Sequence, residues 1–191
     1  MAIKVLGISG SLKPYSSTSF VINLALEAAK EKGAEIEFCE VCTADLPFCD
    51  GRADESTYPE SVHEFRKKVR DAHGIIIGTP EYHNSLTGWL KNALDLCSHD
   101  EFEHKMVGLI GVAGGAMGAI NSINHLRTIM RGVGAWSVPH QVSISNSGKI
   151  FSGPNQLADV MLEKRIKKLG YDVVKFASML THGLLQAEDL S

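Results

Sequence analysis

The residues with the clearest chemical potential lie in the stretch 9–19, where hydroxyl side chains and a lysine follow an apolar run. No acidic residue precedes Glu27. Main-chain N–H groups at the start of a helix have no acceptor within the helix and lie at the positive end of its dipole. Hydroxyl groups can donate further hydrogen bonds, and Lys13 adds a full charge. The stretch therefore predicts a phosphate-binding loop, although serine and threonine also cap helices that bind nothing.

Two absent motifs narrow the class of ligand. The stretch does not match Gly-x-x-x-x-Gly-Lys-Ser/Thr, which disfavours a P-loop nucleotidase. It does not match Gly-x-Gly-x-x-Gly either, which disfavours a dinucleotide lying across the first turn. A loop rich in serine and threonine fits a single terminal phosphate, as on a mononucleotide cofactor. The candidate cofactor-binding residues of this loop are Ser9, Ser11, Lys13, Ser16, Ser17 and Thr18.

A second candidate stretch is 79–84, Thr-Pro-Glu-Tyr-His-Asn, which follows a wholly apolar run. Pro80 fixes a turn, and we expect the N–H groups after it to be free to donate to the carbonyls and nitrogens of a flat ring system. Tyr82 offers an aromatic wall with a polar tip. Glu81 suggests either acid–base chemistry or a supporting role. His83 suggests acid–base chemistry or, more simply, an exposed or backbone-bonded histidine.

Glycines mark a third candidate stretch, 113–118. Gly114 and Gly115 remove side chains where a backbone must approach something closely, either a planar ligand or the next helix. Further along the chain, Arg127 would serve an interface or merely face solvent. Trp89, just after the second stretch, is more typical of a core or subunit contact than of chemistry.

Apolar periodicity places these stretches between strands and helices. The predicted strands are 3–9, 35–41, 74–78 and 107–112, with the last strand material inside 133–145. The predicted helices begin at about Phe20 and end at Lys32, then cover 62–72, about 87–97, the residues before about Met130, and about 155–181. Residues 46–59 are predicted to be irregular, and Gly170 either packs closely or breaks the last helix.

Strand and helix alternate, which predicts an α/β fold: a doubly wound parallel sheet with helices on both faces, in a single domain over 1–191. In such sheets ligands bind beyond the carboxyl ends of the strands, where the strand order reverses. The three candidate stretches follow the first, third and fourth strands. These strand ends meet in a flavodoxin-like five-stranded order, 2-1-3-4-5, whose switch point lies between strands one and three.

Composition limits the partners and the compartment. The chain is 44% apolar and 21% charged, which is typical of a soluble globular protein. A net charge of −3 gives no indication of a nucleic-acid or anionic-membrane partner. No apolar stretch approaches the roughly 20 residues of a membrane helix, and no signal-peptide pattern is present, so we expect a cytoplasmic protein.

Two of the four cysteines, Cys39 and Cys42, have the spacing of a redox pair or of half a zinc site. Neither Cys49 nor Cys97 completes a zinc motif. A thioredoxin-type pair lies at a helix start after a strand, whereas this pair lies inside or just after a strand. We expect structural thiols and no metal.

Three ordered motifs resemble those of the NADPH-dependent FMN reductases, which include bacterial chromate/quinone reductases and plant NAD(P)H:quinone reductases. The motifs are Gly10-Ser11-Leu12-Lys13 with Ser16, Thr79-Pro80-Glu81-Tyr82 leading into Leu90-Lys91-Asn92-Ala93-Leu94-Asp95, and His125-Leu126-Arg127. The resemblance covers roughly residues 3–145. It implies a flavodoxin-like fold that binds FMN non-covalently, in a homodimer or dimer of dimers with the flavin near the subunit boundary.

The resemblance also implies roles for particular residues. The first loop would hold the FMN phosphate through Ser11, Lys13, Ser16, Ser17 and Thr18, while Pro80, Glu81, Tyr82 and His83 would border the isoalloxazine and Gly114 and Gly115 its pyrimidine side. The chain departs from the family pattern in having Lys13 for Arg, Thr18 for Asn, His83 for Asn, Thr87 for Pro and Leu96 for Trp. Lysine keeps the charge but loses bidentate geometry.

We therefore expect an FMN-dependent oxidoreductase that takes hydride from NADPH or NADH. Two electrons would then pass to a quinone, azo compound, free flavin or metal oxyanion by ping-pong kinetics, with no indispensable catalytic side chain. The alternative is a one-electron carrier like flavodoxin, but such carriers are usually acidic and rich in aromatic residues around the flavin, where this chain offers only Tyr15 and Tyr82. A receiver-type signalling domain would need acidic residues in the first loop to hold Mg²⁺, and none is present.

Overall fold

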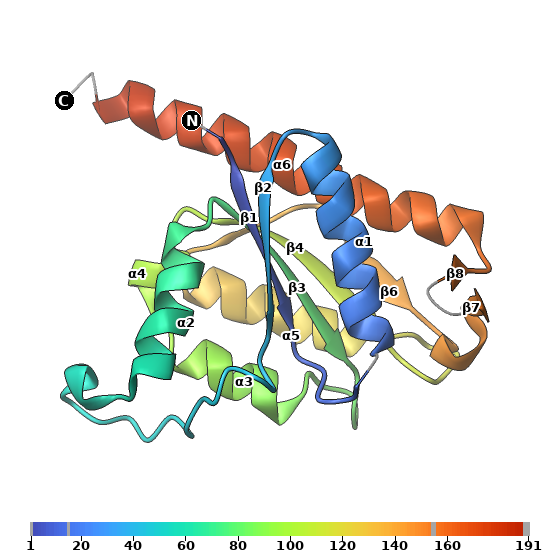
Figure 1. The fold of residues 1–191 in the computed structure, drawn as a ribbon, viewed down its shortest axis with the longest axis horizontal. Coiled ribbons are helices and arrows are strands. Elements are labelled where there is room, and N and C mark those ends of the chain that lie inside the picture. The colour runs from blue at the N-terminus through green and yellow to red at the C-terminus, as the bar shows by residue number, and fades with distance from the viewer. Residues whose placement is uncertain (1, 15, 154–155, 189–191) are drawn as a thin grey trace.

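A parallel sheet forms the centre of the protein in the computed structural model, which describes residues 2–14, 16–153 and 156–188 (Figure 1). The strand order is β2-β1-β3-β4-β5, and β6 also pairs with β4. The strands are β1 (Lys4–Ser9), β2 (Glu35–Glu40), β3 (Gly74–Pro80), β4 (Met106–Val112), β5 (Trp136–Ser137) and β6 (Val142–Ile144). The predicted flavodoxin-like order is confirmed, with its switch point between β1 and β3.

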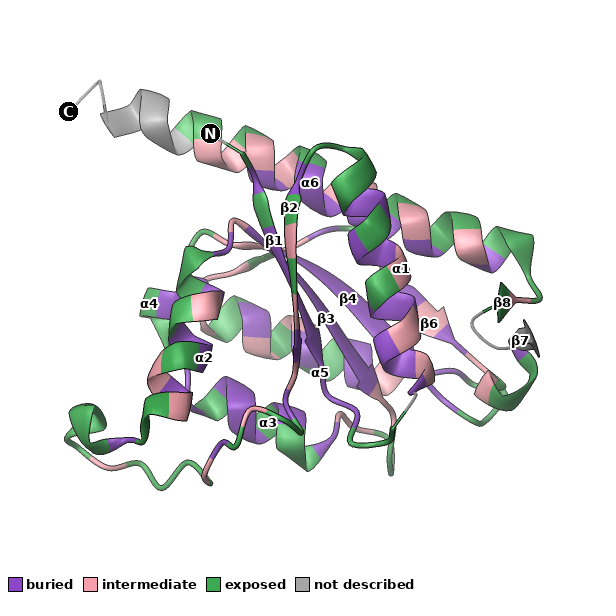
Figure 2. Cartoon of the chain, viewed as in Figure 1, coloured by how far each residue is buried: buried purple, intermediate pink, exposed green. Residues whose placement is uncertain are grey.

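The apolar content of each strand matches its place in the sheet. In β3 every residue before Pro80 is buried, and in β4 every residue after Met106 is buried. Such continuous apolar runs are typical of strands covered on both faces. Strand β2 lies at the edge and is more exposed, with Glu35 and Glu37 reaching solvent (Figure 2).

Helices cover the two faces of the sheet and enclose two separate apolar cores. On one face lie α1 (Ser17–Glu31) and α6 (Val160–Glu188), which pack side by side. The other face is covered by α2 (Glu60–Asp71), α3 (Gly88–Asp95), α4 (His99–Phe102) and α5 (Ile120–Gly132) (Figure 1). The expectation of helices on both faces is therefore confirmed.

Helix α1 begins three residues before the predicted start at Phe20. The reason is Ser16, whose hydroxyl accepts hydrogen bonds from the main-chain N–H groups of Thr18 and Ser19 and so caps the helix. Hydrophobic periodicity does not register a first turn made of hydroxyl residues. The predicted end is confirmed, since Lys32 is the C-cap and Gly33 follows with a φ of 84°.

The fifth position of the sheet is shared by two short strands rather than filled by one. Strand β5 pairs with the start of β4 and β6 with its end, and Pro139 lies between them. Proline has no N–H group for the ladder, which explains the interruption. The sequence did not predict α4, the short 3₁₀ helices η1 (Glu55–Thr57) and η2 (Ser147–Lys149), or the antiparallel pair β7 (Phe151–Gly153) and β8 (Gln156–Leu157).

Gly170 does not break the last helix. Helix α6 runs continuously through it, and a Cβ atom built on Gly170 would lie 2.1 Å from the carbonyl oxygen of Ala25 in α1. The glycine is therefore the point of closest approach that lets the backbones of α6 and α1 touch.

Three further findings concern the whole described chain. In residues 2–14, 16–153 and 156–188, no helix is both long and apolar enough to cross a membrane. The same residues contain no group of three or more His, Cys, Asp or Glu side chains placed to hold a metal ion. All four cysteines are free thiols; Cys39 and Cys97 are buried, while Cys42 and Cys49 are exposed.

Candidate functional site

The three candidate stretches meet at one edge of the sheet because β1, β3 and β4 are parallel neighbours. Hydrogen bonds join the stretches to one another. The N–H of Gly10 donates to the carbonyl of Gly78 at 2.8 Å, and the Thr87 hydroxyl donates to the carbonyl of Gly10 at 2.7 Å. The N–H of Glu81 donates to the carbonyl of Val112 at 2.8 Å. The edge is thus a connected set of loops.

The first loop folds around its own hydroxyl groups. Ser16 caps α1, with 3.0 Å between its Oγ and the main-chain N of Thr18. The Oγ of Ser11, which is buried, accepts a hydrogen bond from the N–H of Lys13 at 3.2 Å. Capping by Ser16 is the simpler interpretation that the sequence allowed for this loop, and it is present. Tyr15 lies outside the described residues.

Two main-chain donors of the loop nevertheless remain without an acceptor in the described part of the chain. These are the main-chain N–H groups of Leu12 and Ser17. Lys13 is exposed and forms no ion pair with any described residue. The first turn of α1 contains no acidic residue. A cation, free N–H groups and a positive helix end together favour an anion over a neutral ligand.

Ser9 lies apart from these donors. Its side chain is completely buried, and its Oγ is 2.9 Å from the Oγ of Ser19 in α1. The Ser9 hydroxyl is therefore directed under the helix and away from the exposed part of the loop.

The second loop forms a tight hairpin. Tyr82 and Ser85 exchange two main-chain hydrogen bonds, at 3.0 and 3.1 Å. The two residues between them, His83 and Asn84, have φ angles of 51° and 62°. Left-handed backbone at both central positions is typical of a type I′ turn, which asparagine tolerates better than histidine does.

The hairpin corrects one expectation about donors. The N–H groups of Glu81 and Tyr82 are not free, because the first donates to β4 and the second closes the hairpin. The N–H groups of His83 and Asn84 are the ones without an acceptor among the described residues. The donors available to a ring system thus lie at the tip of the turn and not directly after Pro80.

Glu81 holds the start of α5. Its Oε2 accepts a hydrogen bond from the main-chain N–H of Ser122 at 2.9 Å. The N-cap residue of α5 is Ala119, which has no side chain able to cap the helix. Glu81 supplies the missing cap from another loop, so of the two roles that its sequence position suggested, the geometry favours support over acid–base chemistry.

Two other side-chain contacts, which were not predicted from the sequence, hold the hairpin and the helix α5 in place. The hydroxyl of Ser85 lies 3.0 Å from Nδ1 of His125, which ties the hairpin to α5. Arg127 was expected at an interface or in solvent, but its guanidinium bonds to Gln141 and to the carbonyl of Val138. These partners lie far apart in sequence, and no local pattern signals them.

The glycine stretch after β4 is open. A Cβ atom built on Gly114 or Gly115 would meet no described atom within 4 Å. The segment after β6 holds the stretch in place, because the N–H of Asn146 donates to the carbonyl of Gly115 at 3.0 Å. Packing within the described chain therefore does not require these glycines. A ligand or a second chain that approaches the backbone would.

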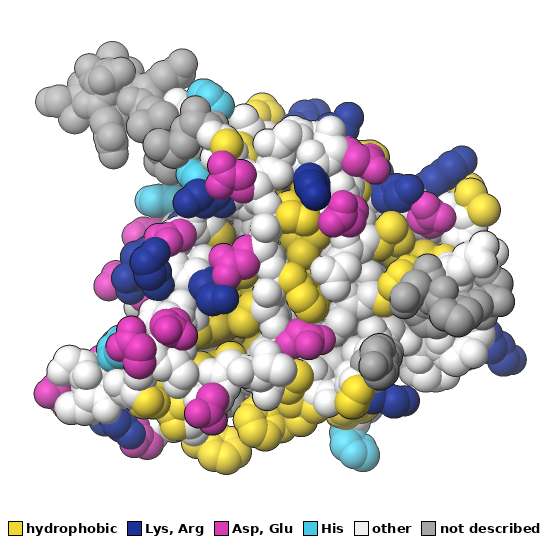
Figure 3. Space-filling model, viewed as in Figure 1, with side chains coloured by type: hydrophobic (Ala, Val, Ile, Leu, Met, Phe, Trp, Pro, Cys, Tyr) yellow, Lys and Arg dark blue, Asp and Glu magenta, His cyan; other side chains and the backbone are white. Residues whose placement is uncertain are grey.

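Exposed apolar side chains surround the same edge. Phe48 stacks on Trp89 with ring centroids 6.3 Å apart, and Asn92 fixes the backbone on both sides of Phe48 by bonding to Pro47 O and Cys49 N. Figure 3 shows hydrophobic side chains gathered along this lower edge of the molecule. The most exposed large apolar residues near the loops are Leu12 (44%), Trp89 (41%), Tyr82 (58%), Phe48 (78%) and Met117 (86%).

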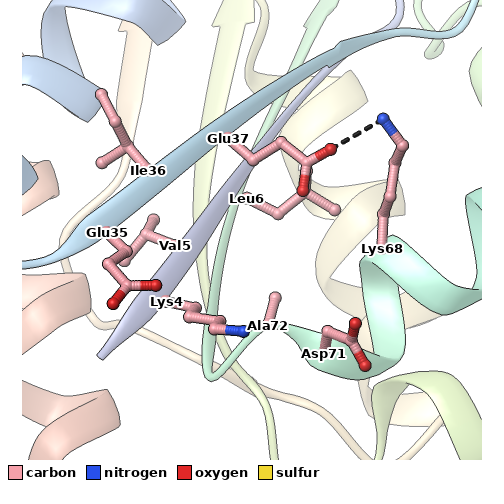
Figure 4. A pocket seen from close by; sticks show the side chains of 9 residues that line it. All are labelled: Lys4, Val5, Leu6, Glu35, Ile36, Glu37, Lys68, Asp71 and Ala72. Carbon is pink, nitrogen blue, oxygen red and sulfur yellow. Dashed lines mark ion pairs between the residues drawn. The ribbon is translucent and has the colours of Figure 1, made fainter. Parts of the chain in front are cut away.

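A hollow at the other end of the strands has no comparable donor set. It lies between the first residues of β1 and β2 and the helix α2, and Figure 4 shows its charged side chains. Lys68 and Glu37 neutralise each other across it at 2.7 Å. Because ligands of such sheets bind beyond the carboxyl ends of the strands, we place the candidate site at the three loops.

Comparisons with known proteins agree with this geometry. Residues 3–149 match the NADPH-dependent FMN reductase family. The chain is 30% identical to an NAD(P)H-dependent FAD/FMN reductase of Geobacillus thermodenitrificans, over 97% of this chain and 99% of the relative. It is 32% identical to an FMN-dependent NADPH-azoreductase of Staphylococcus aureus, over 92% of this chain and 96% of the relative.

Structural comparison supports the same fold. The NAD(P)H:(acceptor) oxidoreductase of Paracoccus denitrificans superposes with a TM-score of 0.78 at 21% identity, covering 93% of this chain and 98% of that chain. The sheet order, the three converging loops and the sequence relatives lead to one conclusion. The chain belongs to the NADPH-dependent FMN reductase family.

Proposed function

We propose that the protein is an FMN-dependent NAD(P)H oxidoreductase that reduces quinones, azo compounds, free flavin or metal oxyanions by a two-electron, ping-pong mechanism. Family membership supports FMN and a nicotinamide coenzyme. The observation that carries the proposal is the acid-free start of α1, where Lys13 and free N–H groups lie at the switch point of the sheet. The domain would comprise residues 1–191.

The first loop would hold the FMN phosphate. Lys13 would provide charge, and the N–H groups of Leu12 and Ser17 would donate hydrogen bonds at the positive end of α1. The remaining residues that we propose for this site are Ser9, Ser11, Ser16 and Thr18. Of these, Ser9 would act by shaping the loop, because its hydroxyl is buried against Ser19.

The second and third loops would hold the ring system. Pro80, Glu81, Tyr82 and His83 would form one wall, with the free N–H groups at the hairpin tip as donors. Gly114 and Gly115 would form the other, since their lack of side chains leaves the backbone open. Tyr82, exposed beside the turn, would exclude water from one face of the ring.

FMN supplies the hydride chemistry when bound, and the protein need only position donor and acceptor in turn. Glu81 is engaged in capping α5, and the hydroxyl of Ser85 and Nδ1 of His125 are engaged with each other at 3.0 Å. We therefore propose that no side chain is indispensable for the chemical step. Main-chain donors would stabilise negative charge that develops on the ring.

We also propose that copies associate as a homodimer or dimer of dimers through the edge that carries the loops. The exposed apolar side chains there support this, because large exposed apolar patches mark contact surfaces. Light scattering after size exclusion would give the mass of the assembly. A monomer at all concentrations would refute this part of the proposal.

The test of the function begins with the colour of the purified protein. We expect a yellow protein that releases FMN on denaturation and is bleached under anaerobic conditions by NADPH or NADH in one two-electron step. Subsequent benzoquinone should restore the colour, and initial rates at several quinone concentrations should give parallel double-reciprocal lines. A colourless protein that is indifferent to added FMN would refute the proposal.

The alternative, a flavodoxin-like carrier, gives a different result in the same experiment. A carrier would be yellow but would not be reduced by NADPH or NADH, and titration with dithionite would pass through a long-lived blue semiquinone after the first electron. The double variant Lys13→Ala, Ser16→Ala should lose FMN affinity in either case, while Lys30→Ala at the other end of α1 should retain it. Unchanged FMN affinity in the double variant would contradict the phosphate assignment.

A further inference from the structure

A chain of hydrogen bonds runs beneath the first loop and ends on a carboxylate. The N–H of Ser11 donates to the Oγ of Ser9 at 3.4 Å, and the Oγ of Ser9 lies 2.9 Å from that of Ser19. The hydroxyl of Ser19 in turn donates to Oε1 of Glu40 at 2.7 Å. The loop is thus connected to the last residue of β2, although no acidic residue belongs to the loop itself.

Three separate elements bring these side chains together. Ser9 and Glu40 are the final residues of β1 and β2 and are register partners, so their side chains project from the same face of the sheet. Helix α1 covers that face, and Ser19 is in its first turn. Ser9 is completely buried, Ser19 is 8% exposed, and Glu40 is half-buried. Buried hydroxyl groups of this kind need partners.

The carboxylate fixes the direction of every hydrogen bond in the chain. An ionised carboxylate only accepts, so Ser19 must give its single hydroxyl proton to Glu40. Ser9 must then donate to Ser19, which leaves the Ser9 oxygen free to accept from the N–H of Ser11. Neither hydroxyl retains a proton for an anion. The acceptor at the end of the chain therefore decides which groups of the loop are structural.

We propose that Glu40 is a positioning residue for the phosphate loop. This inference rests on the proposed function, in which the loop holds the FMN phosphate. Glu40 acts through Ser19 and Ser9 to hold the Ser11 peptide in place, so that Leu12 and Lys13 face outward. The negative charge of Glu40 would by itself repel a phosphate. Glu40 therefore supports phosphate binding through its acceptor oxygen and in spite of its charge.

Two substitutions separate the acceptor from the charge. Glu40→Gln keeps an oxygen that can accept from Ser19 and removes the charge. Glu40→Leu removes both the acceptor and the charge. Ser19→Ala interrupts the same chain from the helix. Glu35→Leu serves as a control, because it lies on the same strand, is exposed and forms no ion pair with a described residue.

The measurement is the affinity of the flavin-free protein for FMN and for riboflavin, which lacks the phosphate, by quenching of flavin fluorescence. We expect Glu40→Leu and Ser19→Ala to weaken FMN binding at least tenfold and riboflavin binding less than twofold. We expect Glu40→Gln and Glu35→Leu to bind both flavins within threefold of the wild type. Circular dichroism at the assay temperature should be that of the wild type for each variant, which checks that each one is folded.

Three results would overturn the inference. The first is a Glu40→Leu variant whose preference for FMN over riboflavin is that of the wild type. The second is a Glu40→Gln variant that loses as much FMN affinity as Glu40→Leu, since the acceptor would then have no role. The third is a wild-type protein that binds neither flavin. That result would refute the proposed function itself, and it is distinguished from the other two because the wild type alone shows it.

Discussion

Gly170 is the residue at which the last helix touches α1, and its replacement by alanine tests how closely the two backbones are packed. The added Cβ would lie 2.1 Å from Ala25 O and 3.2 Å from Ala29 N. Both atoms belong to the backbone of a helix, so neither can rotate away. Relief requires the helices to separate by about 1 Å along much of their contact.

The magnitude follows from two opposing terms. Alanine gains about 1 kcal/mol over glycine in helix propensity. Overpacking of a rigid contact costs about 3 kcal/mol, the upper end of the usual range, because main-chain atoms receive the clash. The net expectation is a loss of about 2 kcal/mol in the free energy of unfolding, or a fall in Tm of about 4–8 °C for a chain of this size.

The same helix offers a matched control. A Cβ atom added to Gly183 would meet no described atom within 4 Å, so Gly183→Ala gains propensity without a clash. We expect it to raise the unfolding free energy by up to about 1 kcal/mol. Denaturant unfolding followed by circular dichroism measures both variants. A Gly170→Ala protein as stable as Gly183→Ala would refute the close contact between α6 and α1.

Three further predictions concern other parts of the chain. Asn92→Ala should lower the unfolding free energy by about 2 kcal/mol, because two hydrogen bonds to the segment 47–49 are lost, and protease should then cleave that segment faster; equal cleavage would contradict the role of Asn92. Burial alone would raise the pKa of Glu101, but hydrogen bonds from Ser98 and Arg70 outweigh it and hold the pKa below its usual value. Folding therefore favours the ionised form of Glu101. Its contribution to stability is complete above the pKa of the unfolded carboxyl and is lost as pH falls through the lower pKa of the folded protein. The Glu101→Gln variant should therefore lose less stability than the wild type between about pH 5 and 3. An unchanged acid transition would contradict this. Iodoacetamide should modify only the exposed cysteines of the native protein. Burial raises the pKa of the other two thiols, and these should react only after the protein is unfolded in urea. The exposed thiols are Cys42 and Cys49, and the buried ones are Cys39 and Cys97.

Much of the fold was predictable because its signals are local. The apolar runs of β3 and β4 and the helical spacing of α1 each specify one element, and their alternation specifies a parallel sheet. The split of the fifth strand was not predicted, because a proline such as Pro139 indicates an interruption without saying where a strand resumes.

The candidate site was predictable only as a set of loops. Composition identified the hydroxyl-rich stretch, and strand order brought it to the switch point. The contacts that organise it were not predictable, because Glu81 reaches Ser122 and Ser19 reaches Glu40 across gaps of 41 and 21 residues. No acidic residue precedes Glu27 in the sequence. The carboxylate of Glu40 nevertheless lies under the loop, because β2 pairs with β1.

Strand β2 has a consequence for how copies of the chain can associate. Among the described strands it pairs with β1 alone, so its outer edge is open to another strand. Half of its sequence, Glu-Ile-Glu-Phe-Cys-Glu, is acidic. Two such edges side by side would bring like charges within about 5 Å of each other. The strand whose last residue anchors the first loop therefore also ends the sheet, because its acidic edge disfavours pairing with the same edge of a second copy.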